Sequence, residues 1–276
     1  MLEVQLLSGR TDVIVGQIHT RSMSALYNAN KYKLASQLVL TLNTYVNVDL
    51  FDMLLEDFKY LCALIDKDSW PEGFRTYEWR CNTPFHVDIL RNMHLEKPAH
   101  IATKPIPCKR LNTEEVRNQR IVTEPYYALP EGYKWPLVRD WVEASDLEEV
   151  YGELAYDAMW IDSDLRLVDT LQYVPMADLL GARAVKTSLV NIKTVLKCSS
   201  CSRRYTDESE LKLLGFFKAS SDKAMMDMSL NLTSALDAYI PDDIPVKKFL
   251  YWYSCYVKDK NEAEEARRLA EAKKRG

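Results

Sequence analysis

The sequence predicts an α+β fold that is rich in helices, with short antiparallel strands and a long proline-rich extended arm. Apolar residues recur at three- and four-residue spacing in several segments, as is typical of amphipathic helices. Short stretches that alternate apolar and polar residues, near the start of the chain and after residue 188, indicate strands. Seven of the eleven prolines lie in residues 84–136, where they disfavour long helices and central strands.

The chain has 276 residues, a length that suits one large domain or two smaller ones. Glycine is scarce, with 8 residues, which argues against glycine-rich phosphate loops and many-turned β-sandwiches. Changes in pattern divide the chain into three expected segments. These are an N-terminal lobe of strands and a helical pair (1–81), a proline-rich insertion with a helix (82–188), and a strand with a Cys-x-x-Cys pair followed by C-terminal helices (189–276).

The N-terminal lobe begins with two expected strands around the turn Ser8-Gly9-Arg10. Apolar residues then recur every four positions from Leu34 to Val46 and predict one face of a helix. Asp49 is a candidate N-cap for the next helix, because a side-chain oxygen there accepts from the first free backbone N–H groups. The apolar stripe Leu50–Ile65 predicts that helix, and residues 74–81 predict a further strand.

The proline-rich stretch 84–136 is predicted to form the extended arm. It carries several aromatic residues, whereas disordered segments are poor in aromatics. We therefore expect the arm to become ordered by lying on its own core or on a partner. The candidate partner-binding aromatics within it are Tyr126, Tyr127, Tyr133 and Trp135.

The second half of the chain contains further helices and a strand. Ser145-Asp146-Leu147-Glu148 matches a capping box and predicts a helix that starts there and runs to Ala158. Residues 189–196 alternate and predict a strand that leads into the cysteine pair. Residues 222–241 predict a helix, and Pro245 suits the first position of the last helix.

The last helix is aromatic where it begins and charged further on. Tyr251, Trp252, Tyr253 and Tyr256 surround more than one face, so we expect a partner outside this domain to contribute to their burial. These four residues are therefore candidate partner-binding residues. Beyond Lys258, glutamate and arginine pairs at four-residue spacing indicate a solvated helix.

The charge and hydropathy of the chain exclude several classes of partner. The net charge of −4 and the pI of about 5.7 exclude a chain-wide basic field, so no nucleic-acid partner is expected. No run of about 18 apolar residues is present, so we expect no membrane-spanning helix. The first ten residues do not match a secretory signal, so we expect the six cysteines to stay reduced.

The pair Cys198-x-x-Cys201, at the end of a predicted strand, has the spacing of half a structural zinc site. Zinc needs two further ligands, for which Cys81, Cys108, His86, His94 and His100 are available, although their spacings fit no standard pattern. Of these, Cys81 and Cys108 are the candidate metal ligands. Three alternatives stay open. The chain holds no cofactor, as we expect; or the four cysteines hold zinc; or the pair is redox-active, which would place it at a helix start.

Motifs for catalysis are missing from the sequence. It contains no GxGxxG, phosphate-loop, HExxH or GxSxG motif. Asp157, Asp162 and Asp164 fit a solvated helix end better than a catalytic carboxylate pair, which must converge on one substrate bond. We therefore expect no enzymatic activity, and an enzyme with an unrecognised site stays an alternative hypothesis.

Several short stretches occur in a suggestive order. They are the strand Val13–Thr20 leading into Arg21–Leu26, Asn47-Val48-Asp49 before the helix Leu50–Asp57, a strand that ends in Cys81, and a strand that meets Lys197-Cys198-Ser199-Ser200-Cys201. This order resembles the baseplate hub or hub-assembly proteins of contractile-tailed bacteriophages. The resemblance covers roughly residues 10–81 and 189–257, and the chain departs from the family pattern by the insertion 82–188. Cys198 and Cys201 correspond to the cysteine pair of the family, which leaves Cys81 as a half-lost copy.

The resemblance implies a structural or assembly role in a tail baseplate, without catalysis. The implied location is the virion tail baseplate and, during assembly, the host cytoplasm. The implied partners are other baseplate or tail subunits in a multi-protein assembly. A second hypothesis, which rests on the cysteines, is a zinc-ribbon-containing module that binds nucleic acid or has a regulatory role.

Overall fold

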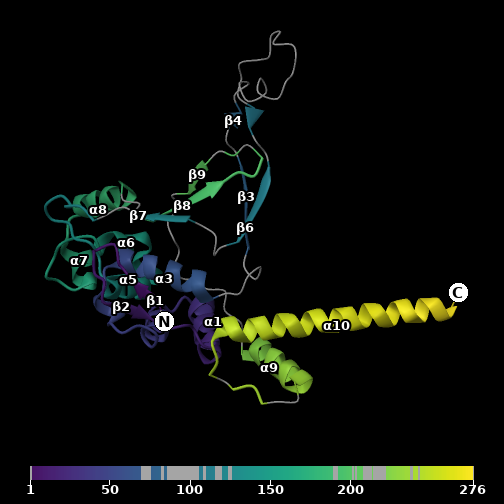
Figure 1. Cartoon of the computed structure of the whole chain (residues 1–276). Helices are drawn as coiled ribbons and strands as arrows, with labels where there is room; N and C mark the ends of the chain where they lie inside the picture. The colour runs from purple at the N-terminus through teal and green to yellow at the C-terminus, as the bar shows by residue number, and fades with distance from the viewer. Residues whose placement is uncertain are drawn as a thin grey trace, which may run out of the picture. The chain divides into compact units, whose positions relative to one another are not determined.

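The structure is a computed structural model of the chain (Figure 1). It describes residues 2–69, 76–81, 84–85, 106–107, 110–115, 120–123, 126–188, 192–200, 202, 204–207, 213, 222–236, 239–241 and 243–275. In these residues the fold is mostly helical with short antiparallel strands, which confirms that part of the α+β prediction. Part of the predicted arm lies outside the described residues, so its extended course stays a prediction.

Contacts along the chain separate two compact units, and both are discontinuous in sequence. The first, which we call the helical unit, comprises Met1–Pro71, Pro125–Asn191 and Leu211–Gly276. The second, which we call the strand unit, comprises Glu72–Glu124 and Ile192–Glu210. The three segments expected from the sequence are each continuous, so the units join parts that the sequence pattern does not connect.

The helical unit opens with a hairpin in which β1 (Leu2–Val4) pairs antiparallel with β2 (Val13–Val15). The predicted turn is confirmed, because Gly9 has a φ of +86°, a left-handed conformation that favours glycine. The helices that follow are η1 (Thr20–Ser22), α1 (Met23–Tyr32), α2 (Ala35–Asn43), η2 (Leu50–Asp52), α3 (Leu55–Ser69), α5 (Val138–Tyr151), α6 (Glu153–Ala158), α7 (Leu167–Tyr173), α8 (Met176–Ser188), α9 (Asp222–Leu236) and α10 (Val246–Arg275).

One apolar core holds the helical unit together, with contributions from the hairpin, most of its helices and the first turns of α10. On α2, Leu38 and Leu42 are fully buried, which confirms the predicted helical face. Phe58 of α3 is also fully buried, and its ring lies 6.3 Å from the ring of Trp141 on α5. The sequence periodicity therefore identified which sides of these helices face inward.

Of two helix starts that the sequence predicted from capping residues, one is confirmed and one is wrong. Asp49 caps η2, since its side chain accepts from the Phe51 N–H at 3.0 Å, as predicted. The predicted helix start at Ser145 is wrong, because α5 begins at Val138 and Ser145 lies inside it. An earlier anchor determines that start: Val138 N donates to Met53 O at 2.9 Å, and Leu55 N donates to Pro136 O at 2.8 Å.

The strand unit is built from short antiparallel pairs. The strands are β3 (Thr76–Arg80) with β6 (Leu111–Glu115), β4 (Pro84–Phe85) with β5 (Ile106–Pro107), and β7 (Arg120–Thr123), β8 (Ile192–Lys197) and β9 (Arg204–Asp207) in the order β7-β8-β9. The predicted strands at 74–81 and 189–196 correspond to β3 and β8. Pro84 pairs with Pro107 in a two-stranded sheet, where a missing backbone donor is tolerated because both strands are edges.

Two leucines on α2 offer a matched test of the core. We expect Leu42→Ala to lower the free energy of unfolding by about 2–5 kcal/mol, because it leaves a cavity among closely packed neighbours. The control is Leu40→Ala on the same helix, where the side chain is 57% exposed and the change should stay within about 0.5 kcal/mol. Urea unfolding followed by circular dichroism measures both, and equal losses would contradict the burial pattern of α2.

Candidate functional site

Helices α9 and α10 of the helical unit enclose an open groove with a volume of about 590 Å³. Its lining is mostly apolar and aromatic, with one acidic and one basic side chain. The lining residues are Leu232, Ala235, Leu236, Trp252, Cys255, Tyr256, Asp259 and Lys260. We refer to it as the α9–α10 groove. A mainly apolar and aromatic surface with a few charged residues is typical of a protein-binding surface.

The start of α10 fixes one wall of the groove to the core. Lys248 N and Phe249 N both donate to Pro245 O at 3.0 Å. Pro245 directly precedes α10, so the helix begins one residue later than predicted, at Val246. Val246, Phe249 and Leu250 are buried in the core of the helical unit. The first turn of α10 is therefore fixed to the core, and the aromatic residues that follow lie on the same helix.

The four predicted aromatics of α10 occupy different positions. Trp252 and Tyr256 line the α9–α10 groove and are half-buried. Tyr253 is also half-buried, with its ring 6.0 Å from that of Tyr256, whereas Tyr251 is 58% exposed. Lys248 Nζ lies 4.8 Å from the centre of the Trp252 ring, a distance at which a cation is attracted to the ring face.

Helix α9 supplies the opposite wall. The sequence predicted one apolar face on this helix, and the structure divides that face: Leu232 is buried, while Leu236 lines the groove and is 53% exposed. Met226 and Leu230 are also exposed. Helix α9 therefore exposes several apolar side chains, of which Leu236 belongs to the groove.

Beyond the groove, α10 continues as a charged helix (Figure 1). From residue 258 onward the described side chains are exposed, apart from the half-exposed Glu264. Pairs at four-residue spacing support the helix: Arg268 Nη2 lies 2.7 Å from Glu264 Oε1, and Lys258–Glu262 and Arg267–Glu271 lie at 3.8 Å. Among the described residues, no helix has both the length and the apolar character needed to cross a membrane.

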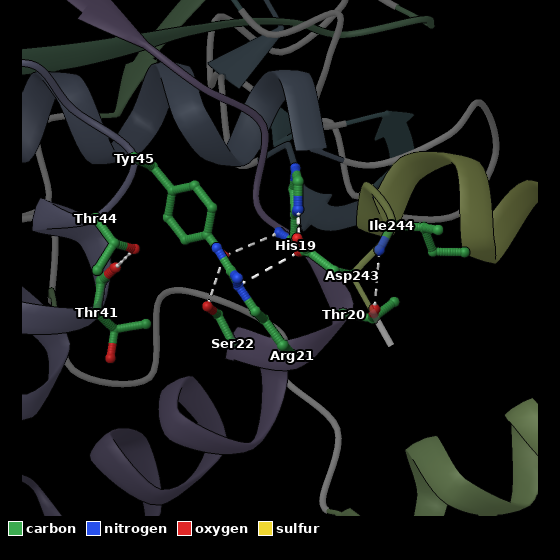
Figure 2. Close-up of polar contacts among 9 residues, drawn as sticks. All are labelled: His19, Thr20, Arg21, Ser22, Thr41, Thr44, Tyr45, Asp243 and Ile244. Atoms are coloured by element: carbon green, nitrogen blue, oxygen red, sulfur yellow. Dashed lines mark hydrogen bonds and ion pairs between the residues drawn. The ribbon is translucent and has the colours of Figure 1, made fainter. Parts of the chain in front are cut away.

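A polar junction joins the start of α10 to the N-terminal part of the chain (Figure 2). Thr20 N donates to Ile244 O at 2.9 Å, and Val246 N donates to Ile18 O at 2.8 Å. His19 Nδ1 is hydrogen-bonded to Asp243, and Arg21 Nε lies 3.3 Å from the same carboxylate oxygen and forms an ion pair with it. The hydrogen bond from His19, followed by the charge of Arg21, holds the pKa of Asp243 below its ordinary value.

Tyr45, which lies just after the end of α2, also contributes to this junction. Its hydroxyl group lies 2.6 Å from Ser22 Oγ and accepts from His19 N at 3.4 Å. Ser22 thus bonds to Tyr45 while the His19 ring is directed to Asp243. The group is suited to holding segments together rather than to activating the serine.

The predicted arm aromatics lie on the core of the helical unit. Trp135 is the centre of the cluster, with the Tyr126 ring at 4.7 Å, the Tyr127 ring at 5.7 Å and the Trp160 ring at 5.5 Å. Tyr126 Oη accepts from Asp57 N at 3.0 Å, and burial, with the nearby acidic charges, raises the pKa of Tyr126 well above its ordinary value. Tyr133 also packs against the core, and Tyr127 is the exposed member.

The four candidate metal ligands are only partly described. Cys81 and Cys198 both lie in the strand unit, each with 1% of its surface exposed. Cys108 and Cys201 lie outside the described residues. Among the described residues, no group of three or more histidine, cysteine, aspartate or glutamate side chains could hold a metal ion.

The sequence pattern did not indicate two of the charged contacts that the structure shows. Nothing local connects His19 with Asp243, which are 224 residues apart in the chain. Asp157, interpreted as part of a solvated helix end, is buried and accepts from Arg183 Nε at 2.9 Å and Nη2 at 2.7 Å. A carboxylate on the inner side of a predicted helix was the signal for such a pair, because buried charges need a partner.

No protein-family model, no curated protein and no solved structure matches this chain. Function is therefore inferred from its own residues and contacts. The α9–α10 groove, carried by a helix that is fixed at its start and charged along its outer half, is the best candidate for a functional surface.

The junction at Asp243 makes stability depend on pH in a defined direction. Because the pKa of Asp243 is lower in the folded than in the unfolded protein, the pair stabilises the fold above about pH 4 and loses that effect as pH falls through the folded-state pKa. We expect Asp243→Asn to lower the free energy of unfolding at about pH 7, with the difference from wild type shrinking toward about pH 2.

Urea unfolding across this pH range measures the effect. Asp164→Asn, at an exposed carboxylate, is the control and should follow the wild-type curve. A difference between Asp243→Asn and wild type that stays constant with pH would contradict the assigned ion pair.

Proposed function

We propose that this chain is a non-catalytic structural or assembly component of a contractile phage tail baseplate that bridges neighbouring subunits. The observation that carries the proposal is the α9–α10 groove, an open apolar surface beside a helix that continues away from the core. The likeness of the N-terminal and C-terminal segments to baseplate hub and hub-assembly proteins supplies the kind of assembly. The location is then the tail baseplate, reached from the host cytoplasm.

The chemistry of the groove favours a protein partner. Trp252 and Tyr256 offer large aromatic surfaces with a polar atom each, the composition that carries binding energy at the centre of interfaces. Asp259 and Lys260 at its margin provide charges of both signs, which orient a partner more than they strengthen its binding. We assign the groove to an apolar segment of a neighbouring subunit.

Bridging requires a second contact, and we assign it to the proline-rich arm. Proline restricts the unbound chain, so an extended arm loses less conformational entropy when it docks. The aromatics Tyr126, Tyr133 and Trp135 fix the C-terminal end of the arm to the helical unit, and Tyr127 stays exposed beside them. The arm then contacts one neighbour while the groove contacts another.

A second candidate function is a zinc-ribbon-containing module that binds nucleic acid or has a regulatory role. The observation that favours it is the β8–β9 hairpin, which places Cys198 directly after a strand. The net charge of −4 argues against nucleic acid as the partner. For this reason we rank the assembly role first.

The experiment is copurification with tail proteins encoded beside the gene. The full chain is co-expressed with tail tube, spike and tape-measure candidates and captured through a tag, and we expect at least one of them to be retained in fixed proportion. Leu236→Glu places a charge in the groove and should weaken that association at least about tenfold, the equivalent of 1.4 kcal/mol. Binding curves measured by interferometry give the change.

The matched control is Leu165→Glu, because Leu165 is 49% exposed and Leu236 is 53% exposed. Leu165 precedes α7 and takes no part in the groove lining, so this variant should bind as wild type does. A chain that stays monomeric and retains none of the tail proteins would overturn the assembly role. Equal weakening by both variants would overturn the assignment of the groove.

A further inference from the structure

The strand unit has a centre made of thiol and amide groups. Of its side chains whose burial the structure describes, the buried ones are Cys81, Asn112 and Cys198. The apolar Leu111 is 49% exposed. The unit comprises 72–124 and 192–210, close to the roughly 70–80 residues below which an apolar core alone rarely suffices. Small domains of this kind commonly rely on disulfides or a structural metal.

Cys198 lies in a hairpin turn suited to metal binding. It directly follows β8, which pairs antiparallel with β9 in a register that sets Lys197 opposite Arg204. The turn is closed by Ser202 N, which donates to Cys198 O at 2.9 Å, and Ser202 has a left-handed φ of +57°. By sequence Cys201 follows Cys198 by three residues, the spacing at which one turn supplies two thiolates to one ion.

Cys81 lies at the end of a second antiparallel pair. It directly follows β3, whose Arg80 pairs with Leu111 of β6, and its own N–H donates to Arg110 O at 3.0 Å. By sequence Cys108 precedes Arg110 by two residues. The β3–β6 pair therefore ends in a cysteine, as β8 does.

Asn112 brings the two strand ends together. Its Nδ2 lies 3.7 Å from Cys198 Sγ and donates to Arg110 O at 3.1 Å, the carbonyl that also accepts from Cys81 N. Its Oδ1 accepts from Ser199 N and Ser199 Oγ, both at 2.9 Å. An amide that donates toward a cysteine sulfur and fixes the turn around it is the kind of outer contact that orients metal-bound thiolates.

Basic residues adjoin both cysteines in the sequence or through a backbone contact. Arg80 directly precedes Cys81, Lys197 directly precedes Cys198, and Arg110 accepts the backbone contact of Cys81. Their side chains are exposed at the ends of the same strands.

We propose that the strand unit holds one structural zinc ion through Cys81 and Cys198. A tetrahedral site needs two further ligands, and Cys201 and Cys108, which lie outside the described residues, are the other cysteines in the sequence ranges of the strand unit. Each thiol that binds gives up its proton to solvent as its sulfur–zinc bond forms, with no change in oxidation state. The ion joins the β3–β6 pair to the β8–β9 hairpin. The assignment is independent of the proposed baseplate role.

The test is the metal content of the full chain, purified through a tag that does not bind metal. Elemental analysis should give about one zinc per chain. Cys81→Ser and Cys198→Ser should each weaken zinc binding at least about 100-fold in competition with a chelating dye. The matched control is Cys255→Ser on α10, at an exposed cysteine of the helical unit, which should bind zinc as wild type does.

Two further measurements cover variants that fail to fold. Asn112→Ala keeps every thiol and should weaken zinc binding about 10–100-fold while the stoichiometry at excess zinc stays at about one. Cobalt added to the metal-free chain should give an intense thiolate-to-metal charge-transfer band, reduced in Cys198→Ser. A chain that is purified without zinc, and whose thermal unfolding is unchanged by zinc or by chelator, would overturn the proposal. So would iron in place of zinc, or zinc binding that is undiminished in both cysteine variants.

Discussion

The carboxylate of Asp57 is the constraint on which the helical unit depends. It lies in the first turns of α3 with 2% of its surface exposed, and it accepts from Ser8 N at 3.1 Å and from Ser8 Oγ at 2.6 Å. The N–H of the same residue donates to Tyr126 Oη at 3.0 Å. A buried carboxylate without such donors is costly, so three segments far apart in the chain must meet at this residue. The chain leaves the helical unit after α3 and returns to it at the contact with Tyr126.

The same constraint reaches the α9–α10 groove through the hairpin. Ser8 lies in the turn between β1 and β2, and the chain that follows β2 pairs through Ile18 and Thr20 with Val246 and Ile244 at the start of α10. The start of α10 is thus held by backbone contacts with the first twenty residues. One wall of the groove is therefore held in place before a partner docks, which lowers the ordering entropy that docking costs.

The sequence was informative where a feature depends on neighbours along the chain. The cap at Asp49, the inner face of α2 at Leu38 and Leu42, and the strand before Cys198 all follow from spacing and local hydrogen bonding. The sequence was not informative where a contact with a distant segment determines the structure. The start of α5 is an example, because it lies at Val138, which is hydrogen-bonded to Met53, and not at the apparent capping box. The pairing of His19 with Asp243 and the union of 72–124 with 192–210 are of the same kind, since no local pattern encodes a partner that is distant along the chain.

The charged part of α10, residues 258–275, has a defined length because it is helical. At a rise of 1.5 Å per residue, residues 258–275 span about 27 Å, and their ion pairs keep them helical without a core. A flexible linker of that contour would sample many separations, whereas a helix sets one. The end of α10 is therefore held at a fixed distance from the α9–α10 groove. In the proposed assembly, inserting or deleting one helical turn in this part of α10 would change the distance between its end and the groove without altering the residues that line the groove.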